Sequence, residues 1–267
     1  MQGASQFVEA LLFTLIAGLA TGIGGAFIFF AKSLDRRILS FSLGLSAGVM
    51  IYVSMIELFP EAAKQLSMTY GDKTGTLYTA LAFFCGILLI GVIDRLIPCD
   101  ENPHEIVCSV EKGQRGRKTL KHTGLLTALA IAIHNFPEGM AVFVAANQSL
   151  RLAIPIVVAI AIHNIPEGIS VAMPIYYSTG SRRIAMRYAT LAGLAEPLGA
   201  LVGYFILMPF MTRELNSLLF AFVAGIMVFI SLDELLPSAE IYGEHHMGMY
   251  GLILGMGLMA LSLWLFM

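Results

Sequence analysis

Two copies of a six-residue pattern place a histidine four positions before a glutamate, at residues 134–139 and 163–168. On an α-helix, side chains four positions apart lie on one face, about one turn from each other. His134 and Glu138 therefore form one pair of neighbouring metal-ligand types, and His163 and Glu167 form a second. A mixed imidazole and carboxylate shell suits Zn²⁺, Fe²⁺, Mn²⁺ or Co²⁺ better than Ca²⁺ or Cu⁺. The spacing predicts a metal site built from both copies.

An asparagine and a proline complete each copy of the pattern. Asn135 and Asn164 directly follow the histidines and add amide oxygens on a neighbouring flank of the same site. Each copy also has a proline before its glutamate. Proline lacks an amide hydrogen, so it frees a carbonyl one turn earlier and bends the helix. We expect the freed carbonyls to face the ion pathway.

The elements that carry these residues are strongly apolar. Of the 267 residues, 57% are hydrophobic and 13% are charged, whereas soluble domains are typically about one-quarter charged. A membrane-crossing helix needs about 20 apolar residues. About eight such runs occur, at roughly 7–31, 38–60, 75–97, 122–147, 151–176, 184–209, 215–238 and 247–267. The predicted fold class is an all-α integral membrane protein with one domain, 1–267, and a cytosolic loop at about 98–121.

Ionisable groups at membrane depth are costly, about 2.5–3.5 kcal/mol each on insertion scales, and by default they mark an ion pathway. The two copies supply two carboxylates, two imidazoles and two amides, and no lysine or arginine lies in the interior of the fourth or fifth span to balance them. A bound divalent cation would supply the missing charge. The alternative is a set of interhelical hydrogen bonds with protonated glutamates, which would hardly require the whole set twice.

Other acids in the spans widen the predicted site. Glu196 stands at a Glu-Pro step of the sixth span and could bridge a second ion. Glu57, Asp233 and Glu234 lie near the ends of the second and seventh spans. They are either gate or relay ligands along the pathway, or acids at the water interface. Their loss should affect transport less than the loss of Glu138 or Glu167.

Internal similarity relates the spans to one another. The matching segments are 130–142 with 159–171, 47–62 with 224–239, and 17–20 with 192–195. An odd number of crossings separates each pair, so spans 1–3 are predicted to be inverted copies of spans 6–8, and span 4 of span 5. Inverted repeats around a midplane site are common in secondary transporters.

The basic residues predict the orientation, because cytoplasmic loops collect lysine and arginine. With the first residue outside, twelve basic residues fall in inner loops and four, Lys64, Lys73, Arg151 and Arg213, in outer ones. Both termini are therefore expected outside the cytoplasm, in a multi-pass protein of the cell (inner) membrane. The first span lacks a preceding basic region and is interpreted as a retained helix. The net charge of −2 gives no indication of a nucleic-acid partner.

With both hexapeptides in consecutive spans, the chain resembles the ZIP (Zrt- and Irt-like protein) metal transporters along its whole length. The resemblance implies uptake of zinc into the cytoplasm, with ferrous iron, manganese, cobalt and cadmium as further substrates, and no enzymatic activity. It also implies a centre for two transported ions between the fourth and fifth helices, with no separate cofactor. The implied ligands are His134, Asn135, Glu138, His163, Asn164, Glu167, Glu196 and, as a thioether contact, Met50.

Two other functional classes use similar ligands. An intramembrane metallohydrolase would hold a catalytic zinc, but the chain lacks the His-Glu-x-x-His pattern and a distinct nucleophile. A metal-gated channel or sensor remains open. The expected partners are divalent metal ions and the lipid bilayer. A homodimer is a working assumption, because no residue pattern indicates an oligomeric state. At residues 99–108 a solvated acidic linker is favoured over a weak cytosolic metal site formed by Cys99, His104 and Cys108. Residues 244–246 are hypothesised to receive ions that leave the centre.

Overall fold

The computed structural model describes residues 2–30, 36–96, 128, 131–132, 135–147, 150–242 and 245–266. Within these ranges the chain is helical with short turns and contains no strand. Seven helical stretches there are long and apolar enough to cross a membrane. The predicted fourth span, 122–147, lies partly outside the described ranges. The chain is therefore an all-α, multi-pass membrane protein with roughly eight spans, as expected.

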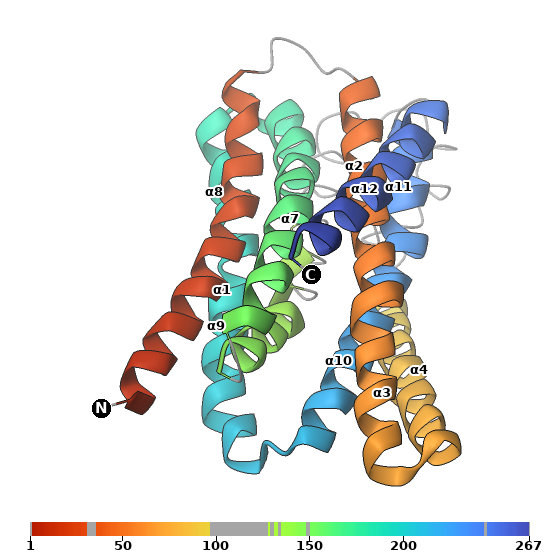
Figure 1. Cartoon of the computed structure of the whole chain (residues 1–267). Coiled ribbons are helices and arrows are strands. Elements are labelled where there is room, and N and C mark those ends of the chain that lie inside the picture. The colour runs from red at the N-terminus through yellow and green to blue at the C-terminus, as the bar shows by residue number, and fades with distance from the viewer. Residues whose placement is uncertain are drawn as a thin grey trace.

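Figure 1 labels the α-helices of the described ranges. They are α1 (Gln2–Ala26), α2 (Arg36–Val53), α3 (Phe59–Tyr70), α4 (Asp72–Leu96), α7 (Leu150–Thr179), α8 (Arg182–Gly193), α9 (Ala195–Val202), α10 (Arg213–Ile230), α11 (Leu236–Tyr242) and α12 (His245–Phe266). Residues 135–147 form a further helical segment that holds the first copy of the Asn-x-x-Glu pattern.

Two π-helical turns interrupt the second and seventh spans at aligned positions. Ser54–Leu58 joins α2 to α3, and Ser231–Leu235 joins α10 to α11. Pro60 and Pro237 stand two residues beyond these turns. A proline in a helix removes one hydrogen bond and crowds the carbonyl four residues earlier, and widening the helix by one residue accommodates that crowding. The helix consequently continues through Pro60 to Tyr70, beyond the predicted limit of the second span at residue 60.

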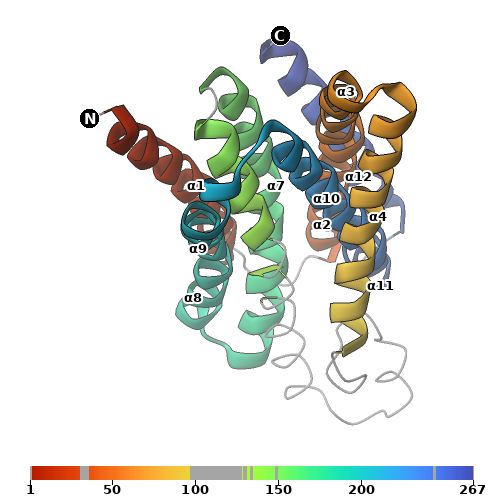
Figure 2. The same cartoon turned by 90° about the horizontal axis from the view of Figure 1, so that it is seen from below.

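The helices form two groups that lie side by side (Figure 2). The first helix group contains α1, α7, α8 and α9, which pack on one another. The second helix group contains α2, α3, α4, α10, α11 and α12, with α12 packed on α2 and α10 packed on α4. Helix α7 contacts both α2 and α12 and so connects the groups.

Glycines allow several helices to approach at backbone distance, because small residues bring helix axes close together in membranes. A Cβ atom on Gly168 would meet the carbonyl of Thr21, and one on Gly139 would meet the carbonyl of Glu196. The sequence repeats align Gly168 with Gly139 and, extended by one residue, Thr21 with Glu196. The same correspondence holds for Gly24 on Ile165 with Gly199 on Phe136. Gly48 and Gly225, which another repeat aligns, make similar backbone contacts with Leu252 and Phe83.

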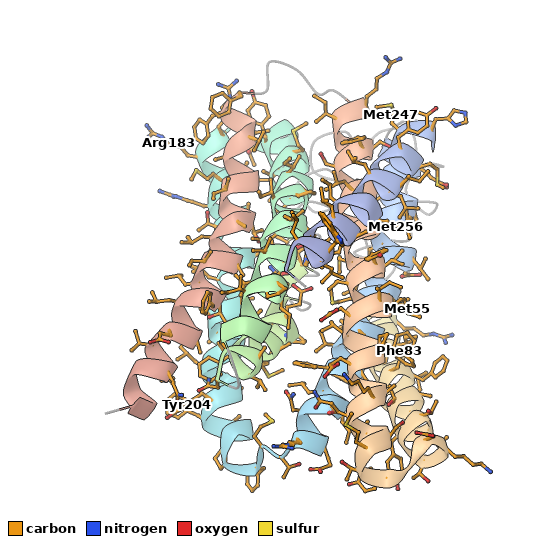
Figure 3. All side chains as sticks on the ribbon, viewed as in Figure 1. Met55, Phe83, Arg183, Tyr204, Met247 and Met256 are labelled. Atoms are coloured by element: carbon orange, nitrogen blue, oxygen red, sulfur yellow. The ribbon has the colours of Figure 1, made fainter. Side chains whose placement is uncertain are left out.

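Labelled side chains mark the two ends of the bundle (Figure 3). Arg183, at the start of α8, and Met247, at the start of α12, lie toward one end, whereas Tyr204 lies toward the other. Large apolar side chains such as Leu81, Phe84 and Leu88 are exposed along α4. In a membrane protein such a face contacts the lipid chains.

Candidate metal centre

Six of the predicted ligands come from three helical elements that meet inside the protein. Asn135 and Glu138 lie on the segment 135–147. His163, Asn164 and Glu167 lie on α7, and Glu196 lies in the first turn of α9. All six side chains are at most 1% exposed: Asn135, Glu138, His163, Asn164, Glu167 and Glu196. His134 lies outside the described residues.

The two copies of the pattern contact each other through His163 and Glu138. The imidazole Nε2 of His163 lies 3.4 Å from Oε1 of Glu138. The histidine of one copy thus faces the glutamate of the other copy. This arrangement places nitrogen and oxygen donors from two helices at one buried point.

The two asparagines are fixed by aligned backbone carbonyls. Asn164 donates from Nδ2 to the carbonyl of Ala17 over 3.0 Å, and Asn135 donates from Nδ2 to the carbonyl of Ala192 over 3.5 Å. These bonds hold the amide groups in place and leave each Oδ1 without a hydrogen-bond partner within the described ranges. Buried polar atoms normally have a partner, so each of these oxygens is a candidate metal ligand.

Glu196 joins the same cluster through Asn164, whose Nδ2 also donates to Oε1 of Glu196. The sixth span breaks at Leu194, between α8 and α9, so that Glu196 stands in the first turn of a new helix. A carboxylate is favoured there because the helix dipole and free amide hydrogens stabilise negative charge. Pro197 is tolerated in the same turn because its missing amide hydrogen would have no helical partner. Oε2 of Glu196 has no hydrogen-bond partner in the described part of the chain.

A serine that the sequence analysis did not single out borders the cluster. The hydroxyl of Ser46, on α2, lies 3.5 Å from Oε1 of Glu167 and 3.4 Å from the carbonyl of His163. It also lies 3.9 Å from the sulfur of Met50, one turn along α2. Helix α2 thus brings this hydroxyl to the glutamate of the second copy, with the expected thioether residue one turn away on the same helix. A polar residue one turn before Met50 in an apolar span was the available signal.

A second buried methionine is related to Met50 by the repeat, although no contact joins it to the centre in the described part of the chain. Met227, on α10, is aligned with Met50 by the repeat and is equally buried. Comparison of the two Gly-x-Met steps, at residues 48–50 and 225–227, would have identified it.

The remaining predicted acids lie elsewhere in the second helix group. Glu57 belongs to the π-helical turn after α2, and Asp233 and Glu234 to the one after α10. All three are partly exposed. Among the contacts of the described residues, none links Glu57 to the central ligands. Their role as pathway ligands stays a prediction.

No three histidine, cysteine, aspartate or glutamate side chains within the described ranges gather closely enough to hold one ion. The expected shell depends on amide oxygens as well, and His134 falls outside those ranges. Of the proposed cytosolic sites, residues 99–108 and Glu244 are likewise not described, whereas His246 is exposed near the start of α12.

Comparison with known proteins gives a consistent set of relatives. The family model described as "ZIP Zinc transporter" matches residues 100–263. The zinc transporter ZupT of Streptococcus mutans is 57% identical over 98% of this chain and 99% of its own length. ZupT of Clostridium perfringens is 54% identical, with coverage of 98% and 97%. ZupT of Chlorobaculum parvum is 52% identical, with coverage of 99% and 100%.

Proposed function

Because this chain belongs to the ZIP zinc transporter family, we propose that it carries zinc ions across the membrane through the buried centre described above. Membership of that family favours a membrane transporter over an enzyme. Zinc is then the transported substrate and not a resident cofactor. The intramembrane hydrolase considered from the sequence gains no support from these relatives.

The observation that carries the proposal is the buried contact between His163 and Glu138, with Glu196 and Asn164 beside it. Imidazole nitrogen and carboxylate oxygen are common zinc ligands. Glu138, Glu167 and Glu196 are fully buried carboxylates, and burying ionised carboxylates without a counter-charge is strongly unfavourable. One or two divalent cations would offset that charge, which supports a binuclear centre completed by His134.

The paired glycine contacts support the predicted inverted repeat. Aligned positions in spans 1 and 6 meet aligned positions in spans 4 and 5. The bonds from Asn164 to Ala17 and from Asn135 to Ala192 obey the same correspondence. A centre between two pseudo-symmetric halves can open to either side in turn, which is the basis of alternating access.

We further propose that transport runs into the cytoplasm across the cell membrane. A hydrated ion would exchange water for imidazole, amide and carboxylate ligands and leave when the helix groups rearrange. Ferrous iron, manganese, cobalt and cadmium are proposed as additional substrates because the same ligand types accept them. Protonation of the ligands would weaken binding, so coupling to protons is part of the proposal.

The test is uptake of radiolabelled zinc by purified protein in liposomes. The intact chain should move zinc saturably, and Glu138→Ala and Glu167→Ala should each reduce the initial rate by at least about ten-fold, the scale of losing even an outer partner of a metal site. Asp72→Ala, which removes an exposed carboxylate at the start of α4, is the matched control and should transport normally.

Two results would contradict the proposal. If the intact protein binds zinc but moves no more than empty liposomes do, a sensor becomes the better account. If flux is fast and does not saturate, the protein is a channel and not a carrier.

A further inference from the structure

Close backbone contacts with α12 fix the position of α2 along its axis and its rotation about that axis. A Cβ atom on Gly44 would meet the carbonyl of Gly248, and one on Gly48 would meet the carbonyl of Leu252. Such backbone contacts leave little freedom to slide. Ser46 lies midway between the two glycines, and because successive residues rotate by about 100° it points to the opposite side of the helix. The packing on α12 therefore fixes where the Ser46 hydroxyl is presented.

The side of α2 that carries Ser46 faces α7, the helix that connects the two helix groups. Ser46 is fully buried. Its hydroxyl reaches Oε1 of Glu167 and the carbonyl of His163. One side chain of the second helix group thus contacts both a proposed ligand and the backbone of another proposed ligand in the first group.

This contact makes the two halves of the centre unequal. One position before the aligned segments 47–62 and 224–239, the repeat aligns Ser46 with Val223. Val223 is buried on α10, and its side chain has no hydrogen-bonding group. Glu138 and Glu167 are aligned by the repeat, but Val223, the counterpart of Ser46, offers no hydroxyl to Glu138.

We propose that Ser46 is a positioning residue for Glu167, which holds the carboxylate toward the transported ion and makes the metal affinity of the centre depend on contact between α2 and α7. The inference rests on the proposed function. A hydroxyl that donates to one carboxylate oxygen limits rotation of the carboxylate and leaves the other oxygen for the ion, as outer partners of metal ligands do. When the two helix groups move apart during transport, the contact breaks and the affinity falls, which favours release of the ion.

Four variants separate this role from general packing. Ser46→Ala removes the hydroxyl, and Ser46→Thr and Ser46→Val form a pair of nearly equal shape that differs in the hydroxyl. Ser40→Ala is the control, because Ser40 is also buried on α2 and donates to the carbonyl of Ala239 over 2.7 Å, a contact within the second helix group. Zinc binding is measured by equilibrium dialysis of the purified full chain, and KM and kcat by uptake into liposomes.

We expect Ser46→Ala and Ser46→Val to weaken zinc binding and raise KM by about ten-fold, with kcat unchanged or higher. Ser46→Thr should stay close to the intact protein, and Ser40→Ala should change KM by less than about two-fold. The inference is overturned if Ser46→Val and Ser46→Thr behave alike, or if Ser40→Ala raises KM as much as Ser46→Ala. Failure of the proposed function is visible separately, because the intact protein would then transport no zinc and Glu167→Ala would not differ from it.

Discussion

At the scale of residues, the two asparagines of the centre are similar in sequence but differ in their contacts. Both donate to an aligned backbone carbonyl, but Asn164 also donates to Glu196. We predict that Asn164→Ala destabilises the metal-free protein more than Asn135→Ala does, because it leaves a buried carboxylate oxygen without its donor. A buried group left unsatisfied costs about 1–3 kcal/mol. Thermal unfolding in detergent with a chelator measures the difference.

Zinc provides the control for this comparison. If the centre binds zinc, added zinc should raise the unfolding temperature of the intact protein, and both variants should lose most of that increase because each lacks an amide ligand. Equal destabilisation of the two variants without metal would show that the bond to Glu196 contributes nothing to stability.

At the scale of elements, glycine contacts determine how closely α7 approaches α1. A Cβ atom on Gly168 would meet the carbonyl of Thr21 and lie 2.8 Å from the amide nitrogen of Gly25. Backbone atoms cannot move aside as a flexible side chain can. We predict that Gly168→Ala forces the two helices apart and displaces the neighbouring residue Glu167. The free energy of unfolding should fall by about 3 kcal/mol, which is the upper end for overpacked sites. Unfolding curves and zinc uptake measure the two effects.

Gly257→Ala is the matched control, because a Cβ atom there has no neighbour within 4 Å. This substitution on α12 should leave stability and uptake unchanged within error. Normal stability of Gly168→Ala would mean that α1 and α7 can separate without cost, and that their close contact does not position the centre.

At the scale of the whole molecule, the distribution of basic residues predicts which end of the bundle is cytoplasmic. Arg183 marks the end where α7 connects to α8 (Figure 3). We predict that a green fluorescent protein fused after Gly180 fluoresces in a bacterial host, because lysine and arginine collect in cytoplasmic loops. Green fluorescent protein fused after Met267 should not fluoresce, whereas alkaline phosphatase fused at that position should be active. The reverse pattern would invert the proposed orientation and the direction of uptake.

Several features of this protein follow from its sequence by itself. The all-α membrane fold was predictable because the thickness of the bilayer sets the length of an apolar run. The spacing was enough to predict that His163 and Glu167 share a face of one helix, because residues four apart do so, but their role as metal ligands stays a prediction. Glu196 was expected in the site as an acid within an apolar span. All these are local properties, carried by neighbouring residues.

The contacts between elements were decided by the tertiary structure. Glu138 meets His163 of the other copy, and Asn164 meets Glu196, because glycine contacts bring three helices to one point. The second span was predicted to end at residue 60, whereas a π-helical turn lets the helix continue. The contact of Ser46 with Glu167 was not predicted either, and 121 positions separate the two residues along the chain. Its place one turn before Met50 is a signal in the sequence, but its role depends on which helix packs against α2.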